Sequence, residues 1–290
     1  MIIPPIDEEA LRDNLAHLLD DDEDARYDAA RAIARMGLPV LDRALAWADD
    51  PRPRMREMAC FILGQIGYRD EQGVVVARDP EGIPVLLRLL ETDPEAEVRA
   101  AAASALGRHA VPNTVSALAR AVSDPSEDVR LEVAIALGIF YWIDEDQSYK
   151  GAAAAALLRL MDDKDEDVRD WATFGIHQGS HDTPETRARL WQALDDPNSA
   201  VRGEAAEGLA LFGDRSLIPR LDALLREDDE LPSHYFTAAE EFGDPILLPA
   251  VEVGAERWLE MQDELHATIV SALEALGGNL LSSDVGPTTD

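Results

Sequence analysis

The sequence predicts an all-α superhelix built of about six to seven stacked helical hairpins, and three observations lead to this fold class. The phrase DPEAEVRAAAASALG (93–107) returns as DPSEDVRLEVAIALG (124–138), and related phrases recur along most of the chain. Each phrase follows a segment with apolar residues at helical spacing, such as IPVLLRLLET (83–92). One helical hairpin of this size cannot bury its apolar face alone, so the copies are expected to stack and share a continuous core.

An Asp followed six residues later by an Arg marks each copy. The six pairs are Asp20 and Arg26, Asp50 and Arg56, Asp93 and Arg99, Asp124 and Arg130, Asp163 and Arg169, and Asp196 and Arg202. We expect each pair to lock the two helices of its hairpin together and to bridge to the next copy. A seventh, worn copy fits DELPSHYFTAAEEFG (229–243), where Tyr235 replaces the Arg.

The helices of a copy follow from local signals. The first helix is the apolar-periodic segment, and PPIDEEALRDNLAHLLD (4–20) supplies it for the first copy. The Asp-Pro turn ends that helix and starts the next one, because Pro suits the first helical positions. The second helix carries Val-Arg and several Ala residues, which let neighbouring backbones approach, and a Gly is expected to close it. The segment 254–276 is typical of a closing helix or helix pair.

The spacing of the Arg residues locates two insertions. Successive Arg residues are 30, 43, 31, 39 and 33 positions apart, and the long intervals contain 68–82 and 141–152. Insertions in repeat arrays usually project as loops from one face. We therefore expect one repeat domain over residues 1–276, with loops near these two places, and a disordered tail rich in Gly, Ser and Thr over 277–290.

The repeated phrase resembles a known family. Residues 93–107 and 124–138 nearly spell the D-P-x-x-x-V-R-x-x-A-x-x-A-L-G pattern of short HEAT repeats of the bilin-lyase type, also called E-Z type, and the resemblance covers roughly residues 18–255. It implies a right-handed solenoid with the first helices on the convex side and the Val-Arg helices on the concave side. It is specific for fold and weak for function, because such arrays serve many roles.

The charge of the chain is extreme, at −32, and Lys150 and Lys164 are the only lysines. Nucleic-acid binding relies on basic side chains that displace counterions, so this balance disfavours it, together with anionic membrane surfaces. The charge favours a basic protein partner through attraction and faster encounter. The alternative, which stays open, is that the acidity serves solubility or reflects a salt-rich host.

The remaining composition predicts a soluble, cytoplasmic protein. The single cysteine, Cys60, excludes an internal disulfide framework and suits a reducing compartment. The start of the chain lacks a secretory signal pattern, and no apolar run approaches the ~18–20 residues of a membrane span. The sequence favours a monomer without establishing the oligomeric state.

A candidate binding groove follows from the helical register. Positions one, two, five and nine after each repeat Arg are not committed to the core, and the first two copies place Tyr27 and Glu57 there. The apolar and acidic members of this row, with one adjacent glutamate, form the predicted concave groove: Phe61, Leu131, Ile135, Trp171, Phe174, Glu204, Glu207, Glu240 and Glu241. Tyr141 and Trp142 would extend it. The alternative is that the register slips and the aromatic residues belong to the core.

Motifs that resemble ligand sites are weak. DKDED (163–167) lacks the Gly and Glu that a calcium loop requires, so it is typical of a helix start. His177 and His181 have metal-like spacing but no third ligand nearby in the sequence, and Cys60 takes a core Ala position. The sequence shows no phosphate-binding loop, nucleophile elbow or Cys/His cluster, so we expect no catalytic residues, no metal and no cofactor.

These observations favour a non-catalytic scaffold or adaptor that binds a basic protein in its groove. A narrower version is an inhibitor or immunity-type protein that neutralises a basic enzyme or toxin. One alternative, evoked by the repeat type, is a bilin lyase subunit, which attaches a tetrapyrrole to its client. Another is an alkylpurine-DNA glycosylase of the HEAT-like type, for which Arg31, Arg35 and Arg108 are too few basic residues.

Overall fold

The computed structural model describes residues 6–69, 75–139, 149–230, 232–261 and 267–278. The chain divides into two compact units, Met1–Gly175 and Ile176–Asp290. Tyr141, Trp142, most of the second predicted insertion and residues 279–290 of the predicted tail lie outside the described residues.

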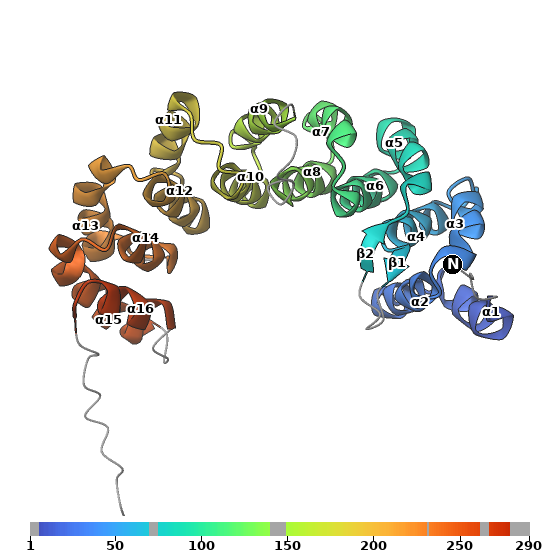
Figure 1. Ribbon diagram of the computed structural model, residues 1–290, viewed down its shortest axis with the longest axis horizontal. Helices are drawn as coiled ribbons and strands as arrows, with labels where there is room; N and C mark the ends of the chain where they lie inside the picture. The colour runs from blue at the N-terminus through green and yellow to red at the C-terminus, as the bar shows by residue number, and fades with distance from the viewer. Residues whose placement is uncertain (1–5, 70–74, 140–148, 231, 262–266, 279–290) are drawn as a thin grey trace, which may run out of the picture. The chain divides into compact units, whose positions relative to one another are not determined.

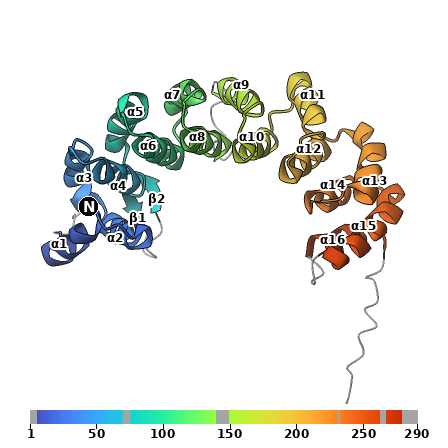
Figure 2. The same ribbon diagram turned by 180° about the vertical axis from the view of Figure 1, so that it is seen from behind.

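Unit 1 is a stack of helical hairpins in two layers, visible in Figures 1 and 2. The first-helix layer consists of α1 (Glu8–His17), α3 (Leu41–Trp47), α5 (Ile83–Thr92), α7 (Val115–Ala121) and α9 (Lys150–Leu160). The second-helix layer consists of α2 (Glu23–Arg35), α4 (Pro53–Leu63), α6 (Ala96–His109), α8 (Glu127–Ile139) and the start of α10 (Glu166–Gln178). Along this layer α2 packs on α4, α4 on α6 and α6 on α8, and Gly138 of α8 lies close to Gly175 of α10.

Unit 2 repeats the same arrangement. Its first helices are α11 (Pro184–Ala193), α13 (Ile218–Glu227) and α15 (Leu248–Met261). Its second helices are α12 (Ser199–Leu211), α14 (His234–Phe242) and α16 (Ala267–Ala275), and α14 packs against both of the others. The predicted closing segment is thus a hairpin of its own, formed by α15 and α16.

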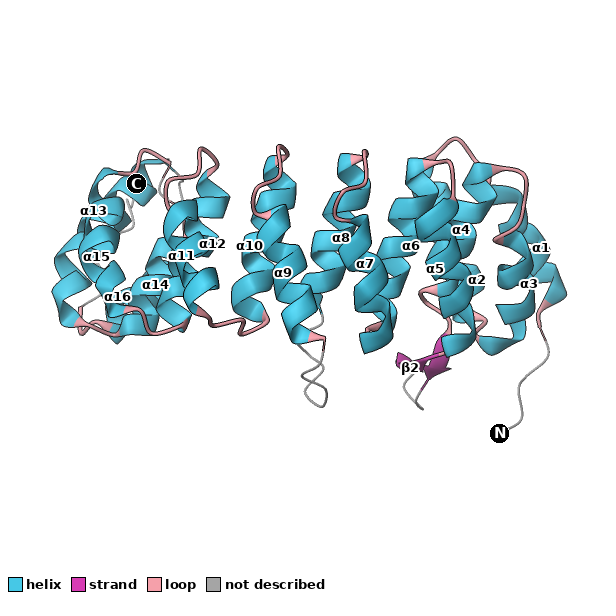
Figure 3. Ribbon diagram, turned by 90° about the horizontal axis from the view of Figure 1, so that it is seen from above, coloured by secondary structure: helices cyan, strands magenta, loops and turns pink. Residues whose placement is uncertain are grey.

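The first predicted insertion contains a short antiparallel β-hairpin. Strands β1 (Gly67–Arg69) and β2 (Val75–Arg78) pair with Gly67 opposite Arg78, and a register shift follows Tyr68. The hairpin lies between α4 and α5, at the edge of the stack opposite the turns that join the two helices of each unit-1 repeat (Figure 3).

The core lies between the two layers and along each layer. Val98, Leu106, Leu118, Val129 and Leu137 are fully or almost fully buried. These observations confirm the all-α repeat-solenoid fold class. None of the helices in the described ranges combines the length and the apolar character that a membrane span requires.

The repeat Arg residues link successive hairpins. Arg56 donates from Nε and Nη2 to both carboxylate oxygens of Asp93, at 2.7 and 2.9 Å, and from Nη1 to the backbone carbonyl of Asp50 at 3.0 Å. Arg130 does the same with Asp163, at 2.6 and 2.9 Å, and with the carbonyl of Asp124. Each Arg therefore ties the turn of its own hairpin to the turn of the following one.

The first members of the series make other contacts. Arg26 donates to the carbonyls of Asp20 and Asp21, while the carboxylate of Asp50 accepts from Arg52 rather than from Arg26. Arg169, the fifth of the series, donates to the carbonyl of Asp163 in its own turn at 3.0 Å, as the other repeat arginines do in theirs. The ladder of bidentate pairs in unit 1 thus begins at Arg56.

In unit 2 the series ends on a different residue from the one that the spacing predicted. Arg202 donates to the carbonyl of Asp196 and to both carboxylate oxygens of Asp228, and Tyr235 donates its hydroxyl to Asp228 at 2.8 Å. The aspartate of the worn repeat is therefore Asp228, one position before Asp229. Tyr235 contributes a hydrogen bond where the other repeats have an Arg.

The repeat glycines serve packing rather than helix termination in the middle repeats. Gly107 lies inside α6, and a Cβ added there would meet Cα and Cβ of Ala136 at 2.8 Å. The helix continues to His109 and closes on Ala110, whose φ is 49°. Gly107 therefore permits the close approach of α6 and α8, and its expected role as the closing residue was wrong.

Candidate functional site

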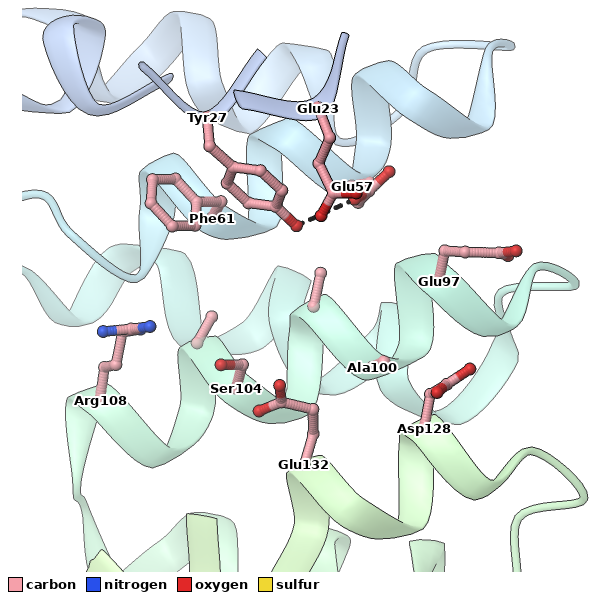
Figure 4. Close-up of a pocket in the computed structure, with 12 residues that line it drawn as sticks. Glu23, Tyr27, Glu57, Phe61, Glu97, Ala100, Ser104, Arg108, Asp128 and Glu132 are labelled. Atoms are coloured by element: carbon pink, nitrogen blue, oxygen red, sulfur yellow. Dashed lines mark hydrogen bonds between the residues drawn. The ribbon is translucent and has the colours of Figure 1, made fainter. Parts of the chain in front are cut away.

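A hollow of about 390 Å³ opens on the second-helix layer of unit 1, between α2, α4, α6 and α8 (Figure 4). Its floor is α6, where the small side chains of Ala100, Ala101, Ser104 and Ala105 face the space. Longer side chains project from the flanking helices. We call this hollow the acidic pocket, and its size is within the range of ordinary ligand sites.

Two aromatic rings form one wall of the acidic pocket. Tyr27 on α2 and Phe61 on α4 meet edge to face, with ring centroids 5.0 Å apart. The Tyr27 hydroxyl donates to Oε1 of Glu57 at 3.1 Å, so it orients that carboxylate (Figure 4). Burial and, after it, the adjacent Glu57 raise the pKa of Tyr27 to about 12, so the phenol remains protonated.

Carboxylates surround the rest of the acidic pocket. They are Glu23, Glu57, Glu97, Asp128 and Glu132, and among the lining residues that the structure describes Arg108 is the one basic residue. Figure 4 shows Arg108 at one end of the floor, with Glu97 and Asp128 toward the other. Burial raises the pKa values of Glu57 and Glu132, because the half-buried carboxylates have lost part of their hydration.

The acidic surface continues beyond the pocket. An adjoining hollow of about 510 Å³ shares Glu23, Glu57 and Glu97 with it and adds Glu95, Arg26 and Arg54. Negative charges that are close together in partly desolvated positions repel one another. A bound cation would reduce this electrostatic repulsion.

The comparisons with known proteins agree with this architecture. The family model for HEAT repeats matches residues 83–177 and 154–235, which together make more than half of the chain. The chain belongs to the HEAT-repeat family.

Individual proteins resemble this HEAT-repeat chain to different degrees. It is 28% identical to "Protein YibA" of Escherichia coli K12 over 248 residues, which make 83% of each chain. The X-ray structure of Escherichia coli YibA covers 94% of this chain, and the chain covers 93% of it, with a TM-score of 0.69 and 26% identity. The CpcE–CpcF complex of the phycocyanin lyase from Nostoc is 17% identical, with 82% and 93% covered and a TM-score of 0.50, which shows a shared fold alone.

The HEAT repeats distribute the predicted groove residues over both units. Phe61 lines the acidic pocket, while Leu131 and Ile135 lie half-buried on α8. Trp171, with 38% of its surface exposed, meets Phe174 edge to face on α10 at 5.4 Å. All of these residues belong to unit 1.

The predicted acidic end of the groove lies in unit 2. Glu240 is half-buried on α14 and accepts from the hydroxyl of Ser271 at 2.7 Å, and Glu241 is exposed. Glu204 is buried and Glu207 half-buried on α12. The acidic residues of the pocket in unit 1 were not part of the predicted groove, although the register rule placed Glu57 and Glu132 outside the core.

Glu204 lies between two histidines. His177 on α10 places Nε2 2.6 Å from Oε2 of Glu204, and His234 on α14 places Nε2 3.2 Å from Oε1. Burial works to raise the pKa of Glu204, but the hydrogen bonds from His177 and His234 outweigh it and hold this pKa at about 2. Burial raises the pKa of the nearby Glu207. The sequence indicated Glu204, Glu207 and His177 separately but did not predict this cluster, because its members come from three helices of different repeats.

Proposed function

We propose that this HEAT-repeat protein is a binding scaffold that takes up a basic segment of a partner protein along the second-helix layer of unit 1. The observation that supports this proposal is the acidic pocket, where five carboxylates and two aromatic rings surround one space. The fold is compatible with many roles, so only the pocket indicates which ligand this protein binds.

An arginine side chain fits the chemistry of this pocket. A guanidinium group stacks on aromatic faces and binds carboxylates through paired hydrogen bonds, and Tyr27 and Glu57 offer both partners side by side. Cation–π contacts of this kind contribute about 0.5–2 kcal/mol, and more when the cation is desolvated. Arg108, at the end of the floor, would face an acidic or carbonyl group of the same partner.

An extended segment fits better than a small molecule. The acidic pocket and the adjoining hollow share three glutamates and so form a continuous acidic surface across α2, α4 and α6. Such a surface can hold successive basic residues of one chain. The charge of −32 would add long-range attraction to a basic partner, and the same charge opposes nucleic acid.

Affinity capture tests this proposal against the groove that the sequence predicted. The tagged protein is incubated with lysate of its host at low and moderate salt, and captured proteins are identified by mass spectrometry. We expect a basic protein that wild type retains and Tyr27→Ala with Phe61→Ala loses. Trp171→Ala with Phe174→Ala should retain it, because these rings lie outside the acidic pocket.

Two results would change the assignment. Loss of the partner only with the Trp171 and Phe174 variant would transfer the site to α10. Equal capture of the same proteins by all variants would contradict a site on either surface. If the partner is an enzyme or toxin, loss of its activity in the complex would establish the narrower inhibitory role.

A further inference from the structure

The cluster around Glu204 in unit 2 has features that an ion-pair network does not require. Helix α12 carries the run Gly203-Glu204-Ala205-Ala206-Glu207-Gly208. Residues three apart lie on the same face of a helix, so the two carboxylates share one side. A glycine flanks each carboxylate on the outside.

Each flanking glycine makes room for an imidazole ring from a neighbouring helix. A Cβ at Gly203 would lie 2.7 Å from Nδ1 and 3.0 Å from Cβ of His234. A Cβ at Gly208 would lie 3.0 Å from Cβ of His177. Both rings therefore approach α12 more closely than any other residue at these two positions would permit.

Three of these side chains converge on one point. One donor atom each from Glu204, Glu207 and His234 can be chosen so that all lie within 4.8 Å of one another, and His234 Nε2 is 3.2 Å from Glu204 Oε1. Donor atoms bound to Zn²⁺ at about 2.0–2.2 Å lie roughly 3–3.5 Å apart, so these three donors would have to move together by no more than about 2 Å to bind one ion.

His177 holds the central carboxylate from the other side. Its buried Nε2 is 2.6 Å from Oε2 of Glu204, the oxygen that His234 does not contact. Hydrogen bonds of this kind to a ligating carboxylate fix its orientation and commonly change metal affinity by about 10–100-fold. The open side of the cluster is reachable from solvent, since the His234 side chain is 31% exposed.

We propose that Glu204, Glu207 and His234 bind a divalent first-row transition-metal ion such as Zn²⁺, with His177 as a positioning residue. One imidazole and two carboxylates suit Zn²⁺, Mn²⁺ or Co²⁺, whereas Mg²⁺ and Ca²⁺ prefer oxygen donors alone. The sequence predicted no metal site, because it paired His177 with His181 along the chain instead of with Glu204 across repeats. This proposal does not depend on the function proposed for unit 1.

Titration of the metal-free protein with Zn²⁺ tests the site. The titration is done by calorimetry in excess Mg²⁺, which occupies the many surface carboxylates, and is repeated with Co²⁺ to follow its visible absorption. We expect one ion per chain in the wild type. Glu207→Gln and His234→Ala should each weaken binding at least tenfold, and His177→Asn should weaken it about 10–100-fold through the orientation of Glu204.

A matched control distinguishes the site from the general acidity of the surface. Glu252→Gln removes an exposed carboxylate elsewhere in unit 2, on α15, and should bind Zn²⁺ as wild type does. Glu207→Gln preserves side-chain shape, so it keeps the test decisive if His234→Ala does not fold. Failure to bind one Zn²⁺ in excess Mg²⁺, or equal binding by wild type and Glu207→Gln, would overturn the proposal.

Discussion

Arg99 donates from Nε and Nη2 to both carboxylate oxygens of Asp124, the aspartate of the next hairpin, each at 2.8 Å. The same Arg donates from Nη1 to the carbonyl of Asp93 in its own turn at 2.9 Å. One side chain thus joins two repeats. The Asp and Arg residues that recur in the sequence are therefore the residues that link one repeat to the next.

Removing one of these arginines should destabilise the array strongly. Arg130→Ala leaves the carboxylate of Asp163 without its bidentate partner at a site where both side chains are less than 10% exposed. Breaking a buried pair in this way costs about 3–5 kcal/mol. Urea unfolding measures the effect.

Arg120→Ala is the matched control, because its pair with Glu91 is 3.8 Å long and exposed. Exposed pairs contribute about 0–1 kcal/mol, so this variant should unfold nearly as wild type does. Equal losses in the two variants would show that the ladder pairs do not carry the stability assigned to them.

The ladder aspartates predict a loss of stability in acid. Burial works to raise the pKa of Asp124, but the hydrogen bonds from Arg99 outweigh it and lower this pKa. Asp93 and Asp163 have lowered pKa values for the corresponding reasons. A carboxylate with a lowered pKa stabilises the folded state above its unfolded value of about 3.9, and this contribution disappears as the pH falls through the folded value.

Urea unfolding of the wild type and of Asp124→Asn, measured at several pH values from about 3 to about 7, tests this pH dependence of stability. These values lie on both sides of the ordinary Asp pKa of about 3.9. The variant should be less stable than wild type at pH 7, and the difference should shrink below the ordinary Asp pKa. A difference that stays constant down to the lowest pH would rule out the charge of Asp124 as its source.

Close packing at Gly107 predicts that its replacement by Ala lowers the stability of the protein, although the same replacement inside a helix usually raises it. Ala normally gains up to about 1 kcal/mol over Gly inside a helix. At Gly107 the added methyl would overlap the backbone of Ala136, and overpacking of this kind costs about 1–3 kcal/mol. Gly107→Ala should therefore lower the thermal midpoint.

Gly151→Ala provides the comparison, because nothing lies within 4 Å of a Cβ added there. This glycine is in α9, so its replacement should raise the thermal midpoint slightly. If both substitutions raised the midpoint, α6 and α8 would not approach as closely as the structure describes.

Most of the fold could be predicted from the sequence, because the same pattern of residues recurs in successive repeats. The Asp-Arg spacing alone places the turns, and the register rule assigns Tyr27, Glu57 and Phe61 to the surface that forms the acidic pocket. The same rule fails at Met58, which is fully buried. A fixed list of offsets cannot tell which neighbouring helix covers a position.

Other features depend on contacts between distant residues. Asp228 replaces Asp229 because Arg202 and Tyr235 both reach it, and the chain offers two adjacent aspartates without indicating which one they contact. The hollow over α6 arises because small side chains on one helix lie below longer ones on its neighbours. That difference is visible only when the helices are placed side by side.

The acidic pocket predicts a pH dependence of cation binding. Burial raises the pKa values of Glu57 and Glu132, so they lose their negative charge at a higher pH than an ordinary glutamate. Affinity for an arginine-containing peptide should therefore fall as the pH decreases from 7, beginning above the ordinary Glu value of about 4.3. Calorimetric titration at a series of pH values measures this.

Glu57→Gln with Glu132→Gln should flatten the pH profile at a lower affinity, because glutamine does not titrate. A wild-type affinity that is unchanged until the pH reaches the ordinary glutamate range would mean that these two carboxylates do not contact the cation.

One pair of titrations decides whether the acidic pocket binds a guanidinium group. An arginine-containing peptide and the same peptide with citrulline, its uncharged analogue, are titrated into the wild type at moderate salt. We predict that the arginine peptide binds at least tenfold more tightly, and that Glu57→Gln with Glu132→Gln removes most of this difference. Equal affinity for the two peptides, or a preference for arginine that the double variant retains in full, would contradict the assignment of the pocket.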